Sequence, residues 1–233
     1  MKTIARTIAV AGLGVCAALP PLPGAAQTAP PPTAAPEQKP GETAERVRVE
    51  GFRSAHWGMT EAQVKAAIQK DFNIAGDKVR VEENPSERTT VLAVSVNDLL
   101  EGAGVARISY ILGYASKKLI QVNIVWGTTV DPQAKPERIV AAANQLRALF
   151  LSSGYEPETI AGNLATADGT IVVFQGEDAA KHLTLLRLVS TPAPPPAKQR
   201  GRADRPGPTV VLLLSYVQDA RNPDVFRLKK GQF

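Results

Sequence analysis

The chain has 233 residues, of which 44% are hydrophobic and 21% charged, a composition typical of a folded globular protein. Its 27 basic and 22 acidic side chains leave a net charge of +5. Removal of an N-terminal leader that contains Lys2 and Arg6 would lower this charge to +3, which is too small to predict a nucleic-acid partner. Cys16 is the only cysteine, so a mature chain that begins at Gln27 excludes disulfides, thiol catalysis and thiolate metal sites.

The N-terminus has the features of an export signal. Basic residues precede an apolar core over residues 8–19, and small residues at 23–26 predict cleavage after Ala26. No later run of eighteen apolar residues occurs, so we expect a periplasmic or secreted protein. Lipidation at Cys16 is the alternative, and it is disfavoured because Val15 is larger than the residue that precedes the cysteine in lipoprotein signals.

A tether and a short strand are expected before the first helix. Residues 27–46 are rich in Pro, Ala, Thr and Gln and lack large side chains, which predicts a disordered segment. Apolar residues then alternate in part over 47–57, which indicates a short edge strand.

The first helix is predicted from Thr60 to Phe72. Thr60 and Gln63 have the spacing of a capping box, in which each side chain bonds the backbone N–H of the other residue. Met59 is placed to pack against the first turn. One apolar stripe follows at helical spacing, and it must be buried against another element: Val64, Ala67, Ile68 and Phe72.

Four strands follow this helix, and turn residues separate them. Their predicted ranges are 78–82, 89–96, 105–112 and 118–126. The last of these alternates most clearly, because Gln121 and Asn123 interrupt a set of apolar residues: Ile120, Val122, Ile124 and Trp126. One face of this strand is therefore expected to pack inward while the other face contacts water.

The same order of elements recurs in the second half. A helix is predicted from Pro136 to Ser152, with Ile139 and Phe150 on its apolar face. Strands are expected at 162–167, 170–175, 182–189 and 209–217, and the loop 191–208, which is rich in Pro and Arg, is expected outside the packed body.

These patterns predict an α+β fold of two halves, each with one helix and four antiparallel strands. One amphipathic helix covers the apolar face of each four-stranded ribbon, and the two ribbons can share one curved sheet with an open face. The predicted organisation comprises a signal peptide, a tether, two halves and a tail: 1–26, 27–46, 47–130, 131–217 and 218–233. Trp57-Gly58 and Trp126-Gly127 precede corresponding helices, as in a tandem repeat.

Two resemblances rest on these features. The order of elements, the Trp57-Gly58-Met59-Thr60 turn and the exported leader resemble the tandem-repeat architecture of secreted β-lactamase inhibitor proteins. The pattern Gly58-Met59-Thr60-x-x-Gln63-Val64 is similar to the start of the first helix in outer-membrane assembly lipoproteins of the BamE/SmpA type. The first resemblance implies inhibition of a hydrolase, and the second implies a partner in the cell envelope.

Patterns of enzymatic chemistry are missing. His56 and His182 are the only histidines, and their spacing does not predict a metal site. Glu82 and Glu83 are adjacent on a predicted strand, so they point to opposite faces and do not form a catalytic pair. Serine-hydrolase motifs and phosphate-binding glycine loops do not occur. We therefore expect no catalytic activity, no metal and no cofactor.

The first functional hypothesis is a non-enzymatic periplasmic protein that binds an envelope protein through the open sheet face. Gln121 and Asn123 are candidate contacts on this face, and Trp57 is a candidate interface anchor or a core residue at a strand–helix corner. The loop 191–208 is a candidate site for an anionic membrane surface, through four basic residues: Lys198, Arg200, Arg202 and Arg205. The alternatives are an inhibitor of a secreted or periplasmic hydrolase and a carrier of an apolar ligand between helices and sheet.

Overall fold

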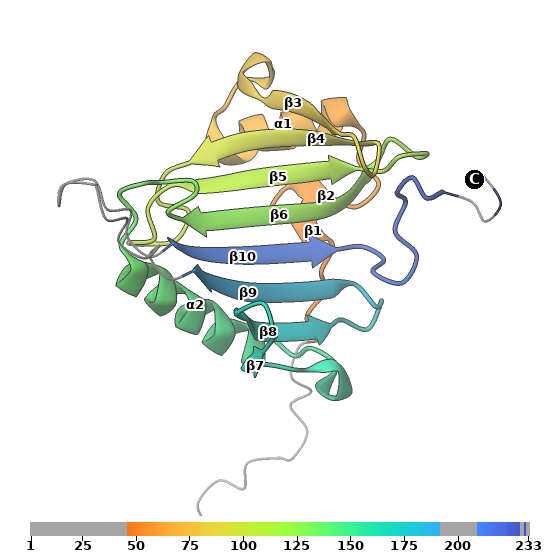
Figure 1. Cartoon of the computed structure of the whole chain (residues 1–233). Coiled ribbons are helices and arrows are strands. Elements are labelled where there is room, and N and C mark those ends of the chain that lie inside the picture. Colours follow the sequence, from red (N-terminus) through yellow and green to blue (C-terminus); the bar gives the residue numbers. More distant parts are fainter. Residues whose placement is uncertain (1–45, 192–208, 229–230, 232–233) are drawn as a thin grey trace, which may run out of the picture. The chain divides into compact units, whose positions relative to one another are not determined.

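One eight-stranded antiparallel sheet contains the strands of both predicted halves (Figure 1). The structure, a computed structural model, describes residues 46–191, 209–228 and 231. The predicted export signal, all but the last residue of the predicted tether, and the four basic residues of the loop 191–208 lie outside the described residues. The predicted α+β class, with a helix and four antiparallel strands in each half, is confirmed.

The elements follow the predicted order, with a small hairpin before the first helix. The first half contains β1 (Gly51–Phe52), β2 (Ala55–His56), α1 (Glu61–Phe72), β3 (Arg80–Asn84), β4 (Thr89–Val96), β5 (Ala106–Leu112) and β6 (Leu119–Gly127). The second half contains α2 (Pro136–Leu151), β7 (Leu164–Ala165), β8 (Thr170–Glu177), β9 (Leu183–Thr191) and β10 (Thr209–Val217). The 3-10 turns η1 (Gly76–Lys78) and η2 (Pro157–Thr159) follow α1 and α2.

The last strand joins the two halves. The order across the sheet is β3-β4-β5-β6-β10-β9-β8-β7, so β10 lies between β6 of the first half and β9 of the second. The pairing of β10 with β6 extends from Val211 opposite Gly127 to Val217 opposite Gln121. The two halves therefore share one hydrogen-bonded sheet.

Local sequence features explain the position of α1. The Thr60–Gln63 capping box is present, and the Thr60 amide donates to Oε1 of Gln63 at 2.9 Å. Val64 and Ile68 are fully buried, as the apolar stripe predicts. The helix ends at Asn73, which adopts the left-handed conformation with φ of 56°.

Helix α2 packs on the sheet through its predicted apolar face. Ile139 is fully buried and Phe150 is 5% exposed. The ring of Phe150 lies 5.2 Å from that of Phe174 on β8 and 6.2 Å from that of Tyr155, measured between centroids. This aromatic cluster fixes the end of α2 against the second half of the sheet. Neither helix in the described ranges has the length and apolar character needed to cross a bilayer.

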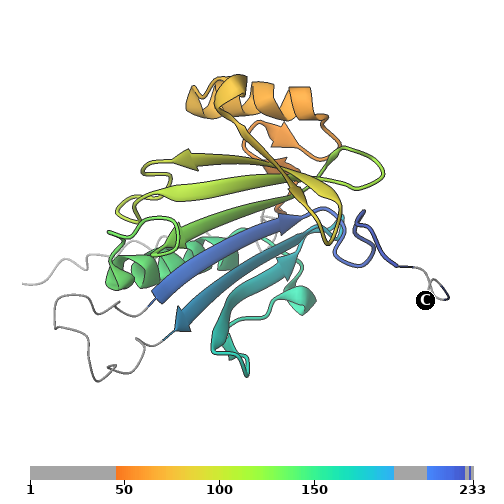
Figure 2. The same ribbon diagram turned by 45° about the horizontal axis from the view of Figure 1, so that its top comes forward.

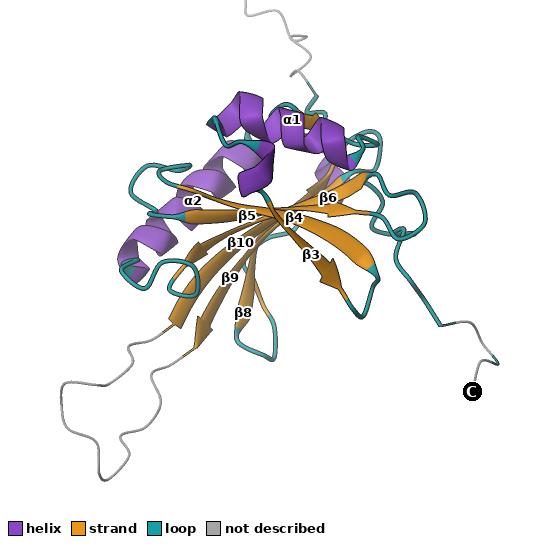
Figure 3. Cartoon of the chain, turned by 90° about the horizontal axis from the view of Figure 1, so that it is seen from above, coloured by secondary structure: helices purple, strands orange, loops and turns teal. Residues whose placement is uncertain are grey.

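The two faces of the sheet differ in what covers them. Both helices lie on the same side, and no helix or strand of the described residues lies over the other side (Figure 2, Figure 3). The strands at the edges of the sheet bend away from the helices, so the uncovered face is concave (Figure 3). Strand alternation places Leu92, Tyr110 and Val122 on the covered face, with their sequence neighbours on the uncovered one.

Part of the predicted C-terminal tail packs against one end of the sheet. The Phe226 amide donates to the carbonyl oxygen of Glu87 at 2.8 Å, and the Tyr114 amide donates to that of Asp224 at 2.8 Å. The Phe226 ring also lies beneath the guanidinium of Arg88, 3.8 Å from ring centroid to carbon. These contacts hold the tail on the turns that connect β3 with β4 and β5 with β6.

Candidate functional site

Strand register aligns the side chains of the uncovered face in rows that cross the sheet. The central row contains Ala93, Ser109, Asn123 and Ser215, from β4, β5, β6 and β10. One flanking row, the Gln121 row, contains Val91, Ile111, Gln121 and Val217. The other, the Arg187 row, contains Arg107, Val125, Leu213 and Arg187. Adjacent rows are two residues apart along each strand, which corresponds to about 6.6 Å.

The central row is recessed between its neighbours. Ala93 and Ser215 are each only 4% exposed, although no helix covers them. Their side chains are small, whereas the flanking rows carry larger, half-buried residues such as Ile111 and Leu213. The face therefore presents a polar strip, lined by small side chains, between two partly apolar rows.

Hydrogen-bonding groups of the polar strip remain available to a ligand. The Gln121 side-chain amide donates from Nε2 to Oδ1 of Asn123 at 2.9 Å, which orients both amides. Among the described residues, the hydroxyls of Ser109 and Ser215 and the Nδ2 group of Asn123 make no hydrogen bond. The strip thus offers three neighbouring groups that can bond to the polar backbone of a bound segment.

The charged side chains of this face are paired, with one exception. Arg107 contacts both carboxylate oxygens of Glu82, at 3.1 and 3.3 Å, and Arg80 contacts the same carboxylate at 3.0 Å. Arg187 on β9 forms no ion pair with the described residues, and its Nε is buried without a hydrogen-bond partner among them. It lies between Leu213 and Val172 on the neighbouring strands.

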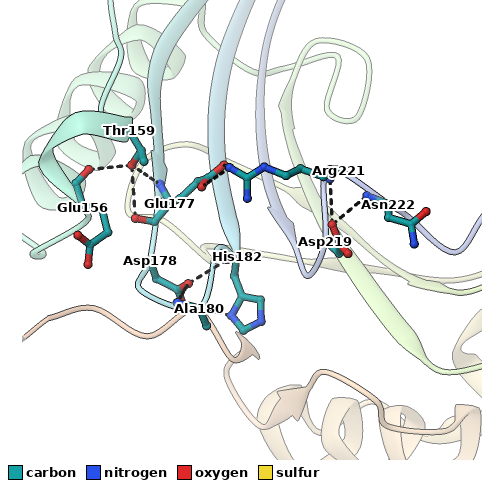
Figure 4. A network of polar contacts seen from close by, with 9 residues as sticks. All are labelled: Glu156, Thr159, Glu177, Asp178, Ala180, His182, Asp219, Arg221 and Asn222. Carbon is teal, nitrogen blue, oxygen red and sulfur yellow. Dashed lines mark hydrogen bonds and ion pairs between the residues drawn. The ribbon is translucent and has the colours of Figure 1, made fainter.

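A polar network at the end of β8 connects the tail to the sheet (Figure 4). Arg221 donates from Nη2 to both oxygens of the Glu177 carboxylate at 2.9 Å. The Glu177 amide in turn donates to the hydroxyl of Thr159 at 2.8 Å, and this hydroxyl donates to the carbonyl oxygen of Glu156 at 2.7 Å. Glu177 ends the Gln121 row, so the network forms a fixed rim for the uncovered face.

Asp178 forms the buried part of this region and is 2% exposed. Its carboxylate accepts hydrogen bonds from the amides of Val49 at 2.8 Å and of Ala180 and His182 at 2.9 Å. Nδ1 of His182 lies 3.1 Å from the same carboxylate. Asp178 therefore connects the β8–β9 turn to the chain segment before β1. His182 is therefore held by hydrogen bonds to Asp178 and has a structural role in this turn.

Replacing Asp178 by asparagine is expected to lower the free energy of unfolding by about 2 kcal/mol, because an amide NH2 would then face backbone N–H donors. Urea unfolding followed by circular dichroism measures this change. The matched control is Asp219→Asn, since Asp219 also accepts two backbone N–H groups but is exposed, and a smaller loss is expected there. Equal losses in the two variants would contradict a structural role for the burial of Asp178.

Buried tyrosine hydroxyls lie on the covered side of the sheet. Tyr155 donates from its hydroxyl to Oγ1 of Thr184 at 2.8 Å, and burial raises the pKa of Tyr155 to about 12. Burial likewise raises the pKa of Tyr110, whose hydroxyl has no hydrogen-bond partner among the described residues. Both hydroxyls therefore belong to the packed side of the sheet.

The structure brings together only part of the predicted site. Gln121 and Asn123 are neighbours on the uncovered face, as predicted, whereas Trp57 packs half-buried at the edge of the core and donates from Nε1 to the carbonyl oxygen of Val49 at 2.6 Å. His56 is exposed, and within the described ranges no three His, Cys, Asp or Glu side chains are placed to hold a metal ion. The predicted basic contacts lie outside the described residues: Lys198, Arg200, Arg202 and Arg205.

Several residues of this face were not predicted as contacts from the sequence. Arg187, Arg107, Ser109 and Ser215 lie on strands that were predicted, but their roles were not. Alternation along β9 and β10 was the available signal, because Arg187 and Leu213 occupy positions between the residues that face the helices.

Comparisons with known proteins give no match. No protein-family model matches the chain, and no match was found among curated proteins or solved structures. The resemblances to β-lactamase inhibitor proteins and to BamE/SmpA-type lipoproteins therefore stay predictions.

Proposed function

We propose that the protein is an exported, non-enzymatic binding protein that holds a protein partner against the uncovered face of its sheet. The observation that carries this proposal is the concave face itself, which no described helix or strand covers. Sheets with an apolar face are normally covered, and an exposed apolar patch rimmed by polar residues marks an interaction site.

The composition of the face supports a macromolecular partner. Half-buried apolar side chains lie around the polar strip, including Ile111, Val125, Leu213 and Val217. Protein interfaces combine such an apolar centre with arginine and with hydrogen-bonding groups, and they are bounded by a polar rim. The Glu177–Arg221 pair supplies a rim of this kind.

The interior is a less favourable site for a small apolar ligand. The space between helices and sheet is filled by large side chains that are less than 2% exposed, among them Tyr110, Phe174 and Ile68. Interiors built from such side chains are normally close-packed, so a ligand would have to displace core side chains. The geometry therefore favours the uncovered face over the interlayer space.

Site-specific photo-crosslinking in the producing cells tests the proposal. A photoreactive residue at Val125, in the middle of the uncovered face, is expected to give a discrete adduct with a protein, and excess unmodified protein should suppress this adduct. The control position is Val140 on the outer side of α2, which is 41% exposed. Adducts at Val140 but not at Val125 would refute the assignment of the face.

A further inference from the structure

We infer that the partner binds the uncovered face through an extended segment that carries an aspartate or glutamate side chain, and that this carboxylate pairs with Arg187. The inference rests on the proposed function, since it specifies the chemistry of the partner at the same face. Three features support it: the state of the Arg187 guanidinium, the charges around it, and its position beside the polar strip.

The Arg187 guanidinium is partly desolvated but has no partner among the described residues. Its Nε is buried without a hydrogen bond, and Leu213 and Val172 lie opposite it on the neighbouring strands. A buried donor without an acceptor destabilises the folded protein, and a charged donor does so more strongly. A carboxylate of the partner would pair with the guanidinium through its terminal N–H groups, and a charge-assisted pair of this kind stabilises a partly desolvated arginine.

The other charged side chains of the face already have partners, so Arg187 is the residue at which a carboxylate of the partner can bind. Arg107 lies in the same row, three strands away at about 14 Å, but Glu82 already binds it. Glu177, at the rim, is bound by Arg221. Arg80 and Arg107 share the Glu82 carboxylate, so Arg187 is the arginine in the described part of the face that has no carboxylate contact, and it can pair with one carboxylate.

The polar strip leads to this position. Leu185 continues the central row on β9, beyond Ser215, and lies two residues from Arg187 along the strand. A segment that crosses the strands along the strip can bond its backbone to Ser109, Asn123 and Ser215. Its next side chain then lies beside Arg187, while apolar neighbours of the acid contact Leu185 and Leu213. An acidic residue flanked by apolar residues fits this arrangement.

Selection of random 12-residue peptides, displayed on phage, on the purified protein provides the probe. We expect enriched peptides to share an Asp or Glu flanked by apolar residues and to crosslink to a photoreactive residue at Val125. Arg187→Gln should weaken binding of a synthetic enriched peptide by at least about 30-fold, the effect of losing an interface hot spot. The matched control is Arg138→Gln, an exposed arginine on α2, which should leave the affinity unchanged.

A charge exchange separates a lost contact from a damaged fold. The Arg187→Glu variant should no longer bind the acidic peptide, and it should bind the same peptide with its acid replaced by lysine. Peptides that crosslink at Val125 without an acid requirement, and that bind Arg187→Gln as well as the original protein, would overturn the inference but not the proposed function. An absence of peptides that crosslink at Val125 would count against both.

Two other occupants of the face give distinct results. If peptides bind only after residues 192–208 are replaced by a Gly-Ser linker of equal length, the occupant is a segment of this chain, and the inference is wrong. A lipid occupant would give three results together: palmitate binds only when Arg187 is present, palmitate displaces every enriched peptide, and the peptide with lysine in place of its acid does not bind Arg187→Glu. In that case the carboxylate belongs to a lipid, and the inference is again wrong.

Discussion

Replacement of Phe150 by alanine is expected to lower the free energy of unfolding by about 3–5 kcal/mol, as is typical of a large aromatic residue removed from a core. The side chain is 5% exposed and contacts the rings of Phe174 and Tyr155. Its loss leaves a cavity between α2 and β8, which neighbouring rings fill only in part. Urea unfolding of the purified protein, followed by circular dichroism, gives the value.

The adjacent residue supplies the control for this variant. Leu149 lies on the same turn of α2 but is 56% exposed, so Leu149→Ala should change the free energy of unfolding by no more than about 0.5 kcal/mol. Similar losses in the two variants would show that α2 does not pack on the sheet through the face that contains Phe150.

Replacement of Gly127 by alanine is expected to lower the free energy of unfolding by about 3 kcal/mol or more. Gly127 has φ of 115°, and an added Cβ would lie 2.1 Å from the carbonyl oxygen of Val210 on β10. Both the backbone conformation and the contact are unfavourable, and the obstructing atom belongs to the backbone, so relief requires the strands to move apart. Because β6 and β10 join the two halves, the variant weakens the junction of the sheet.

The other glycine of the apparent repeat provides the comparison. Gly58 also has a positive φ, of 79°, but apart from its chain neighbours no described residue has an atom within 4 Å of its added Cβ. Gly58→Ala should therefore lower the free energy of unfolding by only about 1–2 kcal/mol, because alanine is strained in the left-handed conformation. Thermal and urea unfolding of both variants measure the difference. If Gly58→Ala proved as damaging as Gly127→Ala, the close approach of β10 would not be the cause.

Local patterns predicted most elements because each depends on neighbouring residues. The ranges of β4 and β10 match the predicted 89–96 and 209–217, where β-branched and apolar residues form continuous runs. The strand predicted at 78–82 begins two residues later, because the 3-10 turn η1 includes Lys78. The strand predicted at 162–167 is reduced to two residues at the edge of the sheet, where only one neighbour supports it.

The candidate site was less accessible to sequence reasoning. Gln121 and Asn123 were placed on the uncovered face because β6 alternates clearly. Arg187 was not recognised, since its importance depends on which strand lies beside β9 and in which register. Of the two roles predicted for Trp57, an interface anchor or a core residue at a strand–helix corner, its packing against the core and its hydrogen bond to Val49 favour the second.

The sequence by itself determined the helices, most strands and their inward faces, because caps, turns and the periods of helix and strand are properties of a few adjacent residues. Only the tertiary structure decided that β10 pairs with β6, that rows of side chains from several strands align, and that neither helix of the described residues lies on the concave face. These features arise from contacts between residues far apart in the chain, since register is fixed when both helices bury their apolar stripes on the same side of one sheet.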